Sequence, residues 1–116
     1  MAFSTVFQAG AFQTLAHGSI SSSYAAVGNP IGAPARMVRL INNTDGDMIF
    51  SMDGATDMFF VPAASYVLYD CGANTGVATN SPALRIRGGT QFYVRQSSAP
   101  TKNSVYVEYI YAYGEV

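Results

Sequence analysis

The stretch 50-FSMDGATDMFFVPAASYVLYD-70 contains the pattern that decides the fold. Two turn signals divide it. Asp53–Gly54 is a dipeptide favoured in tight β-turns, and Pro62 cannot donate a hydrogen bond within a sheet. Aromatic and branched residues, which favour strands, fill residues 58–61 and 65–71. The stretch therefore predicts a strand, a turn, a strand, a second turn and a third strand.

A calcium loop is the competing interpretation of this region, because four aspartates lie between positions 45 and 57. They are Asp45, Asp47, Asp53 and Asp57. A helix–loop–helix calcium site also needs a glutamate at the twelfth loop position and fixed ligand spacing, and neither is present. Aspartates next to glycine are typical of turns, and we expect Asp57 to hydrogen-bond the backbone of its own turn. The sequence predicts turns here and no metal ligands.

Period-two alternation of apolar residues recurs along the chain and predicts further strands. The segments are 35–42, 47–53, 83–88, 90–96 and 105–113. In the last of these, Val107 and Tyr109 share the face that we expect to be buried. Glu108 lies on the opposite face, where we expect it to pair with an arginine of a neighbouring strand such as Arg85, Arg87 or Arg95.

The first 34 residues differ from the rest, because they are rich in Ala, Ser and Gly and only His17 carries a group that ionises near neutral pH. They predict an extended N-terminal arm, residues 1–34, with candidate strands at 12–17 and 19–27. Residues 35–116 form the body of a single domain. Eight or nine strands separated by frequent turns predict an all-β, jelly-roll-like β-sandwich, with a barrel as the less favoured alternative.

Composition argues against several classes of function. The formal net charge is −1 with six Lys and Arg, so no basic stripe is available for nucleic acid. No stretch approaches the roughly 20 apolar residues of a membrane helix. The N-terminus does not resemble a signal peptide, and a single cysteine, Cys71, is typical of a protein made in a reducing cytoplasm. We expect no nucleic-acid or membrane partner.

The residues that usually carry catalysis are almost absent. His17 and Cys71 are the only imidazole and thiol, too few for a zinc site. Cys71 is expected to be buried and unreactive. Neither a nucleophile elbow nor a glycine-rich phosphate loop occurs. The sequence therefore predicts no catalytic, cofactor-binding or metal-binding residues, and no cofactor.

The low fraction of charged residues is the most informative total. It is 11%, against about 25% in ordinary soluble domains, and Tyr and Phe supply 15 residues. Either neutral polar groups cover the surface, or other chains do, and the tyrosines favour the second interpretation. The candidate interface residues are Phe3, Phe7, Phe12, Tyr111 and Tyr113. Tyrosines can also stack on sugar rings, which leaves a carbohydrate-binding module as the alternative.

Two segments carry a family resemblance: 35-ARMVRLINNTDGDMIFSMDGATDMFFVPAASYVLYD-70 and 89-GTQFYVRQSSAPTKNSVYVEYIY-111. Their shared motifs are R-[IL]-x-N-x-T, S-x-DG-x-TD, [FV]-P-A, a YD strand end and QSSAPT followed by VYV. Over about residues 20–113 the chain resembles small structural proteins of tailed bacteriophages.

This resemblance implies a β-sandwich component of the virion that is made in the host cytoplasm and has no enzymatic activity. Its expected partners are further copies of itself and other virion proteins, such as capsid or tail subunits. Capsid decoration, a minor capsid position and the head–tail neck are the expected roles. The carbohydrate-binding alternative corresponds to a module of a tail fibre, a receptor-binding protein or an adhesin.

Overall fold

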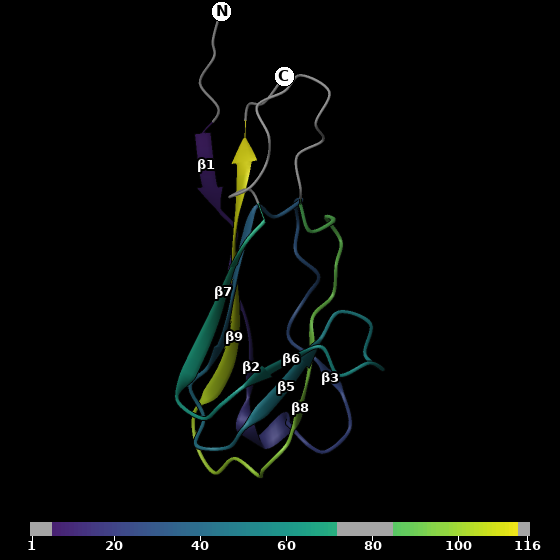
Figure 1. The fold of residues 1–116 in the computed structure, drawn as a ribbon, viewed down its shortest axis with the longest axis vertical. Helices are drawn as coiled ribbons and strands as arrows, with labels where there is room; N and C mark the ends of the chain where they lie inside the picture. Colours follow the sequence, from purple (N-terminus) through teal and green to yellow (C-terminus); the bar gives the residue numbers. More distant parts are fainter. Residues whose placement is uncertain (1–5, 72–84, 114–116) are drawn as a thin grey trace, which may run out of the picture.

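The computed structural model describes residues 6–71 and 85–113, which contain nine strands and one short 3-10 turn (Figure 1). The elements in chain order are β1 (Val6–Ala9), β2 (Gln13–Ala16), η1 (His17–Ser19), β3 (Ala25–Ala26), β4 (Met37–Asn42), β5 (Met48–Ser51), β6 (Phe59–Val61), β7 (Ser65–Asp70), β8 (Tyr93–Gln96) and β9 (Ser104–Tyr113).

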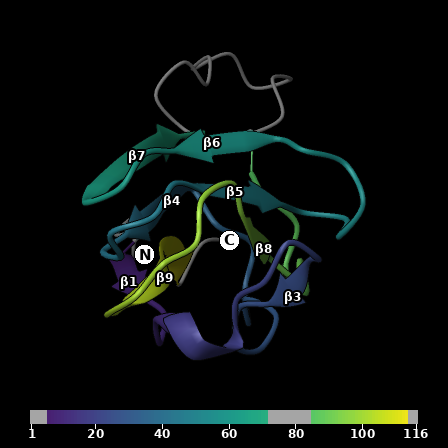
Figure 2. The same cartoon turned by 90° about the horizontal axis from the view of Figure 1, so that it is seen from below.

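The strands form two antiparallel sheets that pack face to face (Figure 2). One sheet has the order β1-β9-β4-β7, with β2 also paired to β9, and the other has the order β3-β8-β5-β6. The pairs β2·β9, β3·β8, β4·β7 and β5·β6 nest inside one another along the chain. A long antiparallel ribbon folded across itself gives this pattern, which defines a jelly roll. The predicted jelly-roll-like β-sandwich is confirmed.

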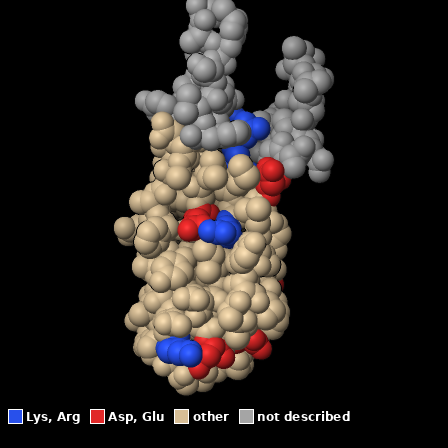
Figure 3. All heavy atoms as spheres, turned by 90° about the vertical axis from the view of Figure 1, so that its left-hand side faces the viewer, with Lys and Arg blue, Asp and Glu red and all other residues tan. Residues whose placement is uncertain are grey.

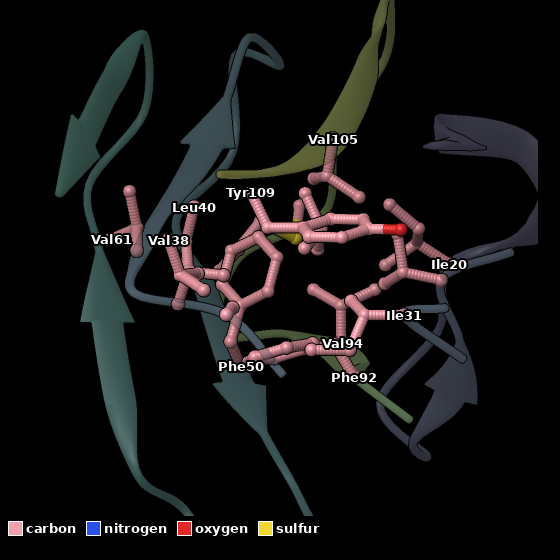
Figure 4. Close-up of a cluster of buried hydrophobic side chains, with 14 residues drawn as sticks. Ile20, Ile31, Val38, Leu40, Phe50, Val61, Phe92, Val94, Val105 and Tyr109 are labelled. Atoms are coloured by element: carbon pink, nitrogen blue, oxygen red, sulfur yellow. The ribbon is translucent and has the colours of Figure 1, made fainter. Parts of the chain in front are cut away.

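The core lies between the sheets and is built from the inward positions of the alternating strands (Figure 4). In β4, Val38 and Leu40 are buried while Met37, Arg39 and Ile41 are only half-buried. In β9 the inward set includes Val107 and Tyr109, as predicted. The buried hydrophobic residues of the core are Ile20, Val27, Ile31, Ala35, Val38, Leu40, Met48, Phe50, Val61, Phe92, Val94, Val105, Val107 and Tyr109.

Part of the expected N-terminal arm, residues 6–34, is built into this body. β1 and β2 both pair with β9, and Ile20, Val27 and Ile31 belong to the core. The ring of Tyr109 lies against Gly10, and its hydroxyl accepts a hydrogen bond from the N–H of Gly32 at 3.0 Å. A contact of this segment with a neighbouring subunit stays a prediction.

Several expected strand features differ in the structure. Of the candidate segment 19–27 only Ala25–Ala26 forms a strand, β3, and of segment 90–96 only Tyr93–Gln96, β8. The described part of segment 83–88 forms a single bridge, Ile86 with Ala35, instead of a strand. Ser51 is buried although period two in segment 47–53 places it on the same face as half-buried Ile49. The reason is local, because Ser51 Oγ bonds Asp53 and the N–H of Gly54, so the strand already turns there.

The motif R-[IL]-x-N-x-T corresponds to a buried polar cluster. The side-chain amide of Asn42 donates to the carbonyls of Gly46, Val61 and Pro62 at 2.7, 3.0 and 3.1 Å. Its oxygen accepts from the N–H and the hydroxyl of Thr44 at 3.0 and 2.6 Å. One buried side chain therefore ties the β4–β5 turn to the end of β6, which satisfies backbone groups that are costly to leave unpaired.

The motif S-x-DG-x-TD corresponds to the turn between β5 and β6. Gly54 has φ +74°, the left-handed conformation that glycine adopts without strain. Asp53 Oδ1 accepts from the N–H groups of Ala55 and Thr56, each at 2.8 Å. The Asp-Gly pair lies where a turn was predicted, but the connection runs from Met52 to Met58 and is longer than a tight β-turn. The hydrogen bonds of this motif build that connection.

Candidate functional site

The four aspartates of the calcium hypothesis act separately. Asp45 accepts from the N–H and hydroxyl of Thr101, whereas Asp47 Oδ1 accepts from the N–H of Ala63 at 3.0 Å. The described residues contain no group of three or more His, Cys, Asp or Glu side chains placed to hold a metal ion. The aspartates fix turns and loop connections.

Asp57 differs from its expected role. Its carboxylate binds the guanidinium of Arg95 through two contacts, Nε–Oδ1 at 3.0 Å and Nη2–Oδ2 at 2.6 Å. The hydroxyl of Tyr24 also donates to Oδ1. Arg95 first and Tyr24 second lower the pKa of Asp57 to about 2. Asp57 therefore bridges the β5–β6 turn to β8 instead of capping its own turn, a role that belongs to Asp53.

The imidazole of His17 and the thiol of Cys71 lie on different elements of the fold. His17 lies in η1, where its Nδ1 is 3.1 Å from the carbonyl oxygen of Asn103. Cys71 follows β7 and is half-buried, not buried as expected. In the described part of the chain, no helix has the length and apolar character needed to cross a membrane.

The most distinctive surface is the outer face of the β7-β4-β9 sheet, called the outer face below. It is lined by Phe12, Met37, Arg39, Tyr66, Leu68, Tyr106, Glu108 and Ile110. Figure 3, which views the molecule from the left-hand side of Figure 1, shows that charged residues gather at a few spots on an otherwise uncharged surface. A groove of about 490 Å³ crosses this face.

The charged residues of the outer face are paired with each other. Arg39 and Glu108 are opposite one another in the β4–β9 register. Nε and Nη2 of Arg39 donate to Glu108 Oε1 at 2.8 and 2.6 Å. The expected pairing of Glu108 with an arginine of a neighbouring strand is confirmed. The arginine is Arg39, however, and not one of the suggested partners Arg85, Arg87 or Arg95. The guanidinium also lies 5.1 Å from the ring centre of Tyr66, within cation–π range.

Large apolar side chains stand on both sides of the groove. Phe12, Tyr66 and Leu68 are 58%, 58% and 56% exposed. The ring of Phe12 rests edge-on against that of Tyr106, with centroids 5.7 Å apart. A contiguous exposed apolar patch on a small protein marks an interaction site more often than bare surface. The outer face can therefore bind another macromolecule by burying apolar area around one neutralised ion pair.

The five candidate interface residues are distributed unevenly. Phe12 stands on the rim of the groove, whereas Tyr111 packs partly buried against the core, 6.2 Å from the ring of Tyr109. Phe3 lies outside the described residues. The side chains of Phe7 in β1 and Tyr113 in β9 also lie outside them, so these three remain predictions.

Sequence reasoning missed Tyr66 and Leu68. The sequence does indicate that they share one face, because they alternate with Val67 in the predicted strand 65–71. The sequence does not show, however, that β7 is the last strand of its sheet among the described residues, or that none of these residues packs over its outer side.

Comparisons with known proteins add one structural likeness. No family model matches the chain, and no curated protein matches it. Among solved structures, the chain is similar to one described as the cyanophage Pam1 capsid asymmetric unit. The two are 18% identical with a TM-score of 0.49, covering 97% of this chain and 88% of the other.

Proposed function

We propose that the chain is a non-enzymatic structural subunit of a tailed-bacteriophage virion, present in repeated or oligomeric copies. Capsid decoration, a minor capsid position or the head–tail neck is its place in the particle. The observation that carries this proposal is the outer face, where Tyr66 and Leu68 of β7 and Phe12 of the β1–β2 connection are each more than half exposed. A surface of this kind suits permanent contact with other subunits.

The sequence motifs support the same proposal. The residues that resemble phage structural proteins, such as Asn42, Thr44 and Asp53, form the turn bonds of the jelly roll. The resemblance is thus one of architecture, as expected for a family of building blocks. The outer face adds a means of assembly, since repeated copies turn a weak contact into a strong one.

A carbohydrate-binding module is the second candidate, and one feature of the groove favours it. Tyr66 and Phe12 offer ring surfaces beside the Arg39–Glu108 pair. Within the described residues, Arg39 Nη1 and Glu108 Oε2 make no hydrogen bond. A donor and an acceptor next to an exposed ring match the adjacent hydroxyls and apolar face of a sugar.

Mass spectrometry of density-gradient-purified phage particles, from a host that carries a phage encoding this chain, tests the proposal. We expect its peptides in the particle band at a copy number of several per virion. Its presence in the lysate but absence from purified particles would overturn the structural role. A glycan array with purified protein tests the second candidate, because Tyr66→Ala should abolish any glycan signal that the unmodified chain gives.

A further inference from the structure

The edges of the two sheets are protected unequally. Short edge strands resist unwanted pairing, as do Pro, Lys or bulges on the edge. Among the described residues, β3 has two residues, β6 has three, and the β1–β2 side is interrupted between Ala9 and Gln13. The edge strand β7 has six residues, SYVLYD, with no Pro or Lys and one charged residue at its end. Within residues 6–71 and 85–113, β7 is therefore an edge that is open to pairing with another strand.

The register of the β4–β7 pair shows which backbone N–H and C=O groups of β7 face β4 and which face away from it. The N–H of Cys71 donates to the carbonyl of Arg36 at 2.7 Å, and the same register continues through β4 and β7. Because hydrogen-bonded pairs alternate in antiparallel sheets, Val67 and Tyr69 bond to β4. The N–H and C=O groups of Tyr66 and Leu68 point to the free side.

We infer that β7 pairs with β7 of a second copy of this chain, antiparallel and across a two-fold axis at Val67. In this register Tyr66 lies opposite Leu68 of the partner, and Leu68 opposite the partner's Tyr66. Both are residues whose backbone groups are free, so the two pairs together form four backbone hydrogen bonds. The inference rests on the assembly proposed above and names the partner for one of its contacts.

The side chains also fit a second copy better than an unrelated strand. Tyr66 and Leu68 share the outer face and are 58% and 56% exposed, so the pairing places an aromatic beside an aliphatic group on both sides of the axis. Asp70 is the one charged residue of β7. The register places the two Asp70 residues at opposite ends of the paired strands, opposite Ala64. No like charges meet, and closed two-fold symmetry is the commonest arrangement of identical subunits.

Disulfide trapping tests the pairing and its register. Tyr66→Cys and Leu68→Cys are made separately, each with Cys71→Ser, and are oxidised alone and as a mixture. In the mixture, position 66 of one copy faces position 68 of the other, and directly opposed residues have Cα atoms about 5.5 Å apart, within disulfide reach. In each single sample the two cysteines are at the same position in both copies and are diagonal neighbours, about 7–8 Å apart. We expect a covalent dimer chiefly in the mixture. Equal yields in all three samples, or none in the mixture, would overturn the inference.

A proline substitution removes one backbone donor of β7, and sedimentation then measures the dissociation constant of the dimer. Leu68→Pro deletes an N–H that points away from β4, and edge strands tolerate proline. Two bonds are lost per dimer, so the dissociation constant should rise about tenfold or more. Leu68→Ala keeps the N–H and serves as the matched control, with a smaller increase. An unchanged dissociation constant for a folded Leu68→Pro variant contradicts the pairing.

These outcomes are independent of the role in the virion. If the chain is found in purified particles but the mixture of cysteine variants does not cross-link, the inference fails and the structural role stands. If the mixture cross-links but the chain is absent from particles, the structural role fails and the pairing stands.

Discussion

At the scale of single residues, Tyr109 shows how one side chain joins separate parts of the fold. It is 7% exposed, its ring lies against Gly10 between β1 and β2, and its hydroxyl accepts from Gly32. A Cβ on Gly10 would be 1.9 Å from Tyr109 Cζ. The glycine is therefore required by packing, although its neighbours in the sequence gave no reason to expect this.

Gly10→Ala tests this contact. The added methyl group must displace the Tyr109 ring or shift β1, and such overpacking costs about 2 kcal/mol or more of unfolding free energy. Gly18→Ala is the matched control, because a Cβ there meets nothing within 4 Å. Chemical denaturation should show a clear loss of unfolding free energy for Gly10→Ala and none for Gly18→Ala. Equal midpoints for both variants would mean that Tyr109 is not held in this position.

Asn42→Ala tests the buried polar cluster. The change removes the partners of three carbonyls and of Thr44 in a fully buried place. Leaving these groups unpaired should cost about 3 kcal/mol. Asn43→Ala, next in sequence but exposed, should change stability by less than about 0.5 kcal/mol. Thermal melting of both variants provides the measurement. Equal melting temperatures would show that the hydrogen bonds of Asn42 do not stabilise the fold.

At the scale of elements, most of the longer strands could be predicted, whereas the strands next to them in the sheets could not. Period two is a local signal, so β4, β5, β7 and β9 were expected within one or two residues of their bounds. The partner of Glu108 depends on which strand adjoins β9. That is set by the jelly-roll order, in which β4 lies beside β9, a feature that spans the whole chain.

The outer face was missed for the same reason. The prediction placed aromatic contacts at the two ends of the chain, where tyrosines and phenylalanines are conspicuous. The structure instead exposes Tyr66 and Leu68, because β7 is an edge strand and no element of the described chain packs over its outer side. Edge position is a property of topology, so it is not visible in the strand's own residues.

The β5–β6 turn predicts a specific dependence on pH. Arg95 and then Tyr24 lower the pKa of Asp57 to about 2, against about 3.9 in an unfolded chain. Backbone N–H groups of Thr56 and Ala55 also lower the pKa of Asp53, and Thr101 that of Asp45. These carboxylates therefore stabilise the fold above about pH 4, and the stabilisation is lost as the pH falls toward 2.

Asp57→Asn separates the contribution of the Asp57 carboxylate to stability from those of Asp53 and Asp45. Its melting temperature should lie below that of the unmodified chain at pH 7. The difference should shrink between pH 4 and 2, because the unmodified chain then loses its charge at this position as well. Melting curves at half-unit intervals of pH provide the measurement. A difference that stays constant down to pH 2 would show that the charge of Asp57 does not stabilise the turn.

At the scale of the whole molecule, the described residues of the jelly roll combine a closed core with an outer face that holds one ion pair, Arg39–Glu108, and with the long edge strand β7. Both features lie on the β7 side of the same sheet, so face contacts and edge pairing can operate together. Charged residues are few, 11% of the chain, and the Arg39–Glu108 pair neutralises the centre of the face. This arrangement suits a subunit whose neighbours supply much of its surroundings.

Hydroxyl-radical footprinting of the chain, free and in purified virions, tests the central claim most directly. The account predicts that oxidation of Phe12, Tyr66 and Leu68 falls several-fold in the particle, because subunit contact excludes water from the outer face. Met52, which is 37% exposed after β5 in the other sheet, serves as the internal control and should be oxidised similarly in both samples. Equal oxidation of all three outer-face residues in the two states would contradict the account.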